Sequence, residues 1–174
     1  MREIAEELGG KECAVDMLDL FKEPLALFNP ESAYASEMYS PLKERVEAAD
    51  VFILGTPDYH GSISSALKNF LDHFWREFAG KLFATVVSSH EKGLTVTDQL
   101  RTVARQCYAW SLPYGISFHE REDIKEGKAH SDYLKAKINM LVQDVMVYGP
   151  LLARQRQNDL RATEPGFLAR YRNK

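Results

Sequence analysis

Cysteine, long apolar runs and an excess of charge of either sign are all scarce in this sequence, and each shortage excludes a class of protein. The two cysteines, Cys13 and Cys107, are too few for a disulfide scaffold, and their apolar surroundings predict reduced core thiols. No apolar run is long enough to cross a membrane, and the charged start does not resemble a signal peptide. A net charge of −3 gives no electrostatic attraction to nucleic acid. We therefore expect a cytoplasmic protein that binds neither membrane nor nucleic acid.

The remaining composition is that of an ordinary globular domain, with 45% hydrophobic and 27% charged residues in a chain of 174. The apolar runs predict strands at 13–20, 51–54, 82–87 and 114–119, the last of them nearer a sheet edge. The amphipathic stretches predict helices at 2–8, 40–49, 63–78, 95–107 and 132–157. This alternation predicts an α/β fold with a parallel sheet covered by helices on both faces.

The segments around these elements carry weaker predictions. Residues 21–40 should form a connector that packs on the surface or at a subunit contact, and 121–131 a solvated charged loop. Gly149-Pro150 should kink or interrupt the long last helix. We expect a single domain over residues 1–157 and a basic tail over 158–174, which either frays or lies on a partner subunit.

The most informative stretch runs from Val51 to Asp72 and predicts a buried strand, a polar turn and a helix. Pro57 ends the strand because it lacks an amide donor and has a fixed φ. Gly61 lets the backbone turn, and Ser62 or a neighbour can cap the helix. Loops at the carboxyl ends of parallel strands are where α/β sheets bind ligands. The loop between this strand and helix is therefore the first candidate site.

A specific family resemblance lies within this stretch. Gly55-Thr-Pro-Asp-Tyr-His-Gly-Ser-Ile-Ser-Ser-Ala-Leu-Lys-Asn-Phe-Leu-Asp72 resembles the signature of the NADPH-dependent FMN reductase family, with conservative differences such as Ser65. Weaker similarity in the order of strands, loops and helices extends from Cys13 to the last long helix. The resemblance implies a flavodoxin-like three-layer sandwich with strand order 2-1-3-4-5, bound FMN and NAD(P)H as co-substrate. It also implies a homodimer or homotetramer.

The resemblance further implies which residues line the flavin. In such proteins the Thr-Pro-x-Tyr-x-Gly segment lines the isoalloxazine ring, chiefly through backbone groups, and the loop after the next strand lies along the other polar edge of the ring. Carried over to this chain, the cofactor-binding residues are Thr56, Pro57, Asp58, Tyr59, His60 and Gly61, followed by Ser88, Ser89, His90 and Gly93. The second loop departs from the glycine-rich form of many members because His90, Glu91 and Lys92 are bulky and charged. His90 or Lys92 either donates to the pyrimidine edge of the ring or is an ordinary surface residue.

A second departure concerns the phosphate of FMN. The family begins with a strand and a loop resembling Gly-Ser-x-Arg-x-x-Ser, which holds the phosphate at a helix N-terminus. Nothing like it precedes Arg2, so the chain is expected to begin inside the first helix. Three explanations are open: a start recorded too far downstream, a truncated paralogue with weak or no FMN binding, or a fragment. If the chain is this short, the strands at 13–20 and 51–54 must pair directly or leave a gap.

Some residue types raise other interpretations. Ser88, His90 and Asp98 lack the nucleophile elbow of a hydrolase. His119 and Glu120 end a strand but lack a third metal ligand. We therefore predict neither a catalytic side chain nor a metal site, in keeping with hydride chemistry that belongs to the cofactor.

Two aromatic features keep alternatives as well. Trp75 and Phe78 are expected in the core or at a subunit interface rather than against the flavin. Tyr59 either lies along the flavin or is structural, with its hydroxyl tying two loops together.

These observations predict an FMN-dependent NAD(P)H oxidoreductase that passes hydride through FMN to a small-molecule acceptor: a quinone, an azo compound, a free flavin or a metal ion. The alternative is a flavodoxin-like module with weak or no FMN binding that acts through protein contacts. An electron-transfer flavodoxin is a third possibility, which the mild net charge of −3 disfavours.

Overall fold

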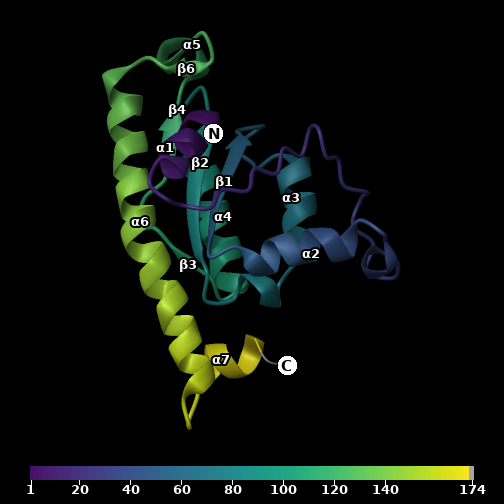
Figure 1. The fold of residues 1–174 in the computed structure, drawn as a ribbon. Coiled ribbons are helices and arrows are strands. Elements are labelled where there is room, and N and C mark those ends of the chain that lie inside the picture. The colour runs from purple at the N-terminus through teal and green to yellow at the C-terminus, as the bar shows by residue number, and fades with distance from the viewer. Residues whose placement is uncertain (173–174) are drawn as a thin grey trace.

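The computed structural model describes residues 1–172 and has three layers, with a mainly parallel sheet between two layers of helices (Figure 1). The helices are α1 (Arg2–Gly9), α2 (Tyr39–Ala48), α3 (Ser65–Asp72), α4 (Leu94–Gln106), α5 (Glu120–Asp123), α6 (Asp132–Arg161) and α7 (Phe167–Arg172). The strands are β1 (Val51–Pro57), β2 (Leu82–Ser88), β3 (Trp110–Ser111), β4 (Ile116–Phe118), β5 (Ile124–Lys125) and β6 (Lys128–Ala129). The predicted α/β fold class is confirmed.

Strand β2 lies at the centre of the sheet. It pairs in parallel with β1 on one side and with β3 and β4 on the other. The register places Pro57 opposite Ser88, and Ser88 opposite Phe118, so β1, β2 and β4 end at the same level. This arrangement matches strands 3, 4 and 5 of the flavodoxin-like order. Within the described chain β4 has one strand neighbour, in agreement with its predicted place near an edge.

Alternate side chains of β2 enter two separate cores, as the two-residue period of a strand requires. Leu82, Ala84 and Val86 join the core beneath α1 and α6. Phe83 joins the core beneath α2, α3 and α4, where its ring centroid lies 5.2 Å from that of fully buried Phe78. Helices therefore cover both faces of the sheet, as predicted.

Helix α6 extends over 30 residues and continues through Gly149-Pro150. The predicted interruption at this point is therefore wrong. A Cβ atom on Gly149 would stand 2.7 Å from Val51 Cγ2, so glycine is what lets α6 lie against β1. Within residues 1–172, no helix combines the length and the apolar character that a membrane span needs.

The predicted strand at residues 13–20 is wrong. This segment pairs with no strand of the described chain, and Val15 and Met17 are each 43% exposed. In the flavodoxin-like order a further strand would stand between this segment and β1, and no residue from 1 to 172 forms it. The apolar pattern is that of a strand, but without a partner the segment has no ladder to join.

The two cysteines lie in different environments, and both are free thiols. Cys107 is in the core beneath α4, as predicted, and burial together with the charges of Asp72 and Glu77 raises the pKa of its thiol to about 11. Cys13 is half-buried, so its placement in the core is wrong.

Two other segments are more ordered than predicted. Residues 121–131 form most of α5 and the hairpin β5–β6 rather than a loop, and the Asp123 carboxylate organises them by accepting from the His119 amide at 2.7 Å. The described part of the predicted tail is the end of α6 followed by α7. Phe167 and Tyr171 of α7 pack against Tyr108, with ring centroids 5.1 and 4.8 Å away. This part of the chain is therefore helical, and the division at residue 157 stays a prediction.

The connector before α2 is held by Asn69 of the Leu-Lys-Asn stretch. Its side-chain oxygen accepts from the Phe28 amide at 2.7 Å, and its side-chain nitrogen donates to the carbonyls of Leu25 and Ala26. The connector thus packs on the surface, as predicted, although Leu27 within it is 86% exposed.

Candidate functional site

Three loops leave the sheet at one edge because three parallel strands end at the same level. They are the turn 58–62 after β1, the loop 89–93 after β2 and the segment from His119 after β4. Backbone bonds join them: the Asp58 amide donates to the Ser88 carbonyl at 2.8 Å, and the Ser89 amide to the Phe118 carbonyl at 2.9 Å. The two segments that the sequence singled out therefore lie side by side.

The turn after β1 is a tight two-residue reversal. Tyr59 and Ser62 exchange both backbone hydrogen bonds, at 3.0 and 3.1 Å, while His60 and Gly61 between them have φ of 57° and 74°. Two positive φ values identify a type I′ turn, which explains the glycine. The turn leaves Tyr59 61% exposed, and its hydroxyl has no hydrogen-bond partner within residues 1–172. The interpretation in which Tyr59 ties two loops together is therefore wrong.

Asp58 joins the turn to the second loop. One carboxylate oxygen accepts from the Gly61 amide at 2.8 Å, and the other accepts from the Ser89 hydroxyl at 2.9 Å. The Ser89 oxygen in turn accepts from the Glu91 amide at 3.1 Å. Hydrogen bonds to an ionised acceptor are the stronger ones. A single carboxylate thus fixes the relative position of both predicted cofactor loops.

Thr56 positions the helix that follows the turn. Its hydroxyl donates to the Pro57 carbonyl at 2.9 Å and accepts from the Ser64 amide at 3.0 Å. The Ser64 hydroxyl caps α3 by accepting from the Leu67 amide at 3.3 Å. Ser64, a neighbour of Ser62, is therefore the cap. Because Thr56 is 5% exposed, its side chain supports the turn from beneath.

Gln99 of α4 holds the turn from the other side, and sequence reasoning missed it. Its side-chain oxygen accepts from the Ser62 hydroxyl and the Ile63 amide, and its side-chain nitrogen donates to the Gly61 carbonyl, all at 3.2 Å. A polar residue on an amphipathic helix gives no sign of such a role, because the contact spans 36 to 38 positions of sequence.

Gly93 begins α4 in a left-handed conformation with φ of 56°. A Cβ atom there would stand 2.9 Å from Val87 Cγ1 and 3.1 Å from Ser117 Oγ. The Ser117 hydroxyl is buried and has no hydrogen-bond partner within the described chain. Gly93 is thus required by local packing, whatever the site binds.

Two histidines meet where the second and third loops run together. Nδ1 of His90 lies 2.9 Å from Nε2 of His119, and the ring centroids are 4.9 Å apart. Nδ1 of His119 is buried, with a Glu122 carboxylate oxygen 4.0 Å away. The sequence named His90 as a cofactor residue but gave His119 no role in the flavin site. The signal that was available is that His119 directly follows the strand next to β2.

The residues at this edge fit a flat heterocycle. The backbone amides of His60 and His90 donate to no acceptor within residues 1–172, so the two loops offer donors from two sides. Exposed Tyr59 adds an aromatic ring. A flavin ring carries carbonyl and nitrogen acceptors along one edge, which such donors suit. This donor set therefore fits the ring portion of FMN.

Helix α1 begins near the same edge of the sheet. The Met1 sulfur lies 2.8 Å from where a Cβ atom on Gly55 would stand, so the start of α1 rests on β1. Helix N-termini stabilise phosphate. The described residues before α1, however, do not include the Gly-Ser-x-Arg-x-x-Ser loop that the family uses for that purpose.

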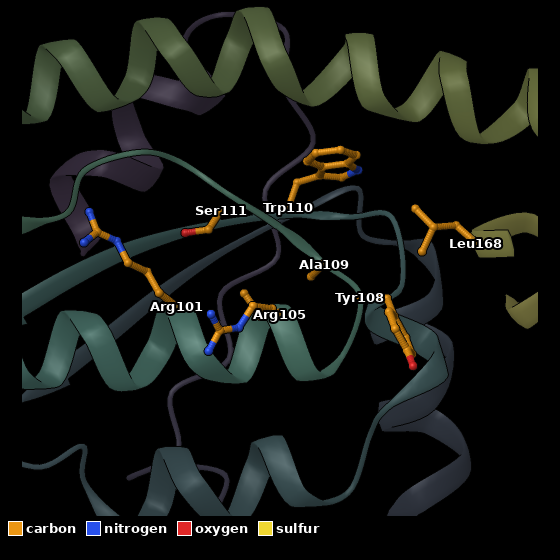
Figure 2. A pocket seen from close by; sticks show the side chains of 8 residues that line it. Arg101, Arg105, Tyr108, Ala109, Trp110, Ser111 and Leu168 are labelled. Atoms are coloured by element: carbon orange, nitrogen blue, oxygen red, sulfur yellow. The ribbon is translucent and has the colours of Figure 1, made fainter. Parts of the chain in front are cut away.

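A separate hollow of about 250 Å³ lies at the opposite edge of the sheet (Figure 2). Its lining is Arg101, Ala104, Arg105, Tyr108, Ala109, Trp110, Ser111 and Leu168. Figure 2 shows that α4 supplies the arginines and that Trp110 and Leu168 stand across from them. This hollow contains none of the predicted site residues.

Comparison with known proteins places the chain in a family. The sequence model described as NADPH-dependent FMN reductase matches residues 1–123. The FMN-dependent NADPH-azoreductase of Staphylococcus aureus strain USA300 is 29% identical over 141 residues, which cover 76% of this chain and 74% of the relative. The predicted family, its enzyme class and its use of FMN and NAD(P)H are thereby confirmed.

Solved structures agree on the fold. The apo form of the NADH:FMN oxidoreductase EMOB superposes with a TM-score of 0.66 at 16% identity, over 84% of this chain and 80% of that one. FerB, a flavoenzyme NAD(P)H:(acceptor) oxidoreductase from Paracoccus denitrificans, gives a TM-score of 0.66 at 17% identity, over 88% and 87%. With the match of its first 123 residues, the edge of three joined loops identifies this chain as a member of the NADPH-dependent FMN reductase family.

Proposed function

We propose that this protein transfers hydride from NAD(P)H, through bound FMN, to a small two-electron acceptor of the quinone or azo class. FMN supplies the hydride chemistry when it is bound, so the protein has to bind and orient rather than react. The observation that carries the proposal is the pair of loops locked by Asp58, which present free amides on two sides of one edge. The azoreductase relative supports an azo acceptor.

The ten predicted site residues take two kinds of role in this proposal. Tyr59, His60 and His90 meet the ring, by an aromatic face or a backbone amide. Thr56, Pro57, Asp58, Gly61, Ser88, Ser89 and Gly93 shape the loops that present those groups. A homodimer or homotetramer in the cytoplasm belongs to the same proposal, since the family resemblance implies the oligomer and the composition favours the location.

Asp58→Ala tests the site. The substitution removes two hydrogen bonds to a carboxylate, each worth about 1.5–3 kcal/mol when the partner is charged. We expect the Kd for FMN, measured by quenching of flavin fluorescence, to rise by about tenfold or more. Asp98→Ala is the matched control, because Asp98 pairs with Arg101 on the exposed surface of α4. It should leave the Kd unchanged.

The activity is tested by following NADPH oxidation with FMN and either a quinone or an azo dye. A protein that binds no flavin at any concentration would contradict the enzyme proposal and favour the module that acts through protein contacts. Sedimentation across a dilution series measures the oligomer separately from the cofactor.

A further inference from the structure

The contact between His90 and His119 is a hydrogen bond between two ring nitrogens. At 2.9 Å one nitrogen must carry a proton and the other a lone pair, since two N–H groups or two lone pairs would repel. The two remaining nitrogens differ in their surroundings. Nδ1 of His119 is buried near Glu122, whereas His90 is exposed and its Nε2 has no partner within the described chain. The pair therefore has a closed end and an open end.

These geometries define two protonation states that differ by one proton. In the charged state His119 carries both of its protons, and the bare Nδ1 of His90 accepts one of them, which leaves N–H at Nε2 of His90. In the neutral state the bridging proton belongs to His90, and Nε2 of His90 is bare. Releasing a proton from Nε2 of His90 and shifting the bridging proton across 2.9 Å converts the first state into the second. No ring has to turn.

The groups around the pair favour its charged state. The titratable and charged residues facing it from the adjoining turn, its own loop and α5 are Asp58, His60, Glu91, Lys92, Glu120, Glu122 and Asp123. Five of these are carboxylates and one is a lysine, so the local charge is negative and stabilises a positive imidazole pair.

We propose that the His90–His119 pair supplies the proton that a two-electron acceptor needs, with Nε2 of His90 as the donor. The inference rests on the proposed function, because the pair stands at the edge where the cofactor loops meet. A quinone that gains a hydride and one proton becomes a hydroquinone, and an azo group becomes a hydrazine. The hydride brings both electrons, and the proton comes from His90, which regains one from His119. Water then recharges the pair.

His90→Gln and His119→Gln test the proposal by stopped-flow kinetics on the FMN-loaded protein. General acids contribute about 100-fold or more to rate. We therefore expect oxidation of the reduced protein by 1,4-benzoquinone to slow about 100-fold in His90→Gln. In His119→Gln the slowing should be smaller, since water can still recharge His90. Reduction by NADPH should be unchanged in both, because that step consumes no proton from the pair.

Ferricyanide is the matched acceptor control. It takes single electrons and needs no proton, so both variants should reduce it at the wild-type rate. The wild-type quinone rate should also fall as the pH rises through about 6.5, where histidine ordinarily loses its proton, whereas the His90→Gln rate should not. His130→Gln controls for loss of any histidine, since His130 is exposed and lies outside the site.

A measurement without cofactor checks the relay itself. In ¹⁵N spectra of the flavin-free protein, the shared proton should give a scalar coupling between Nδ1 of His90 and Nε2 of His119, which His119→Gln abolishes. Equal slowing of quinone and ferricyanide would overturn the proposal, as would a His90→Gln variant with the wild-type quinone rate. Both results leave the proposed function intact, whereas a protein that binds no FMN would overturn that function first.

Discussion

At the scale of single residues, Gly93 is the position where the backbone leaves least freedom. Gly93→Ala would add a Cβ atom 2.9 Å from Val87 Cγ1 on a residue with φ of 56°. A left-handed conformation costs about 1–2 kcal/mol for an L-residue, and overpacking costs about 1–3 kcal/mol. We expect urea denaturation to show a loss of about 2–5 kcal/mol in the free energy of unfolding.

A second glycine separates the two causes. Gly127→Ala is the control, because Gly127 has φ of 77° but no atom within 4 Å of its Cβ position. It should lose only the conformational part, about 1–2 kcal/mol. Equal losses in the two variants would show that Val87 and its neighbours do not constrain Gly93.

Residues of the first cofactor loop were predictable because their chemistry is local. Pro57 and Gly61 carry their conformational limits in their own covalent structure, and a tight turn needs both kinds. His119 and Gln99 were not assigned to the site. Their partners, His90 and Gly61, lie 29 and 38 positions away, and only the register of the strands and the placement of α4 bring them together.

At the scale of elements, Lys81 couples the start of β2 to the end of α2. Its ammonium donates to the carbonyls of Val46 and Glu47, at 2.6 and 2.8 Å, and so caps the last turn of α2. Burial, with a smaller effect from Arg156, lowers the pKa of Lys81 to about 8. Between about pH 8 and pH 10.5 the folded chain thus binds fewer protons at this residue than the unfolded chain does. Lys81 therefore makes the free energy of unfolding rise with pH in that window.

Lys81→Met removes this dependence. From pH 8 to pH 10, we expect the wild type to gain stability relative to the variant, by up to about 3 kcal/mol for a shift of this size. The measurement is urea denaturation of both proteins at each pH. A difference between them that stays constant with pH would mean that Lys81 is not depressed in the folded state.

Elements were predicted where one face is apolar and a partner is present. β1, β2 and the helices that cover them meet both conditions. Residues 13–20 meet the first condition only, and they remain without a ladder. α6 continues through Pro150 because packing of Gly149 on Val51 supports it from outside the helix. Tertiary contacts of this kind are not visible in a local pattern.

At the scale of the whole molecule, the described residues fit the ring of FMN but not its phosphate. We therefore expect the 174-residue chain to bind riboflavin, which lacks the phosphate, about as tightly as FMN. A ligand at 100 times its Kd stabilises by about 2.7 kcal/mol, so equal affinities give equal shifts of Tm at equal concentration. Thermal denaturation with each ligand measures this. A clearly larger shift with FMN would locate a phosphate contact on residues that the fold does not suggest.

The single ladder that holds β1 affects how the protein moves. β1 pairs with β2, and its outer edge has no strand beside it within residues 1–172. Opening one ladder is therefore enough to free the strand that ends in the Asp58 turn. Such partial openings need less free energy than global unfolding and occur many times during the life of the native state. The cofactor turn thus lies on the segment of the sheet that opens most readily, so the empty site should sample many conformations that ligand binding would suppress.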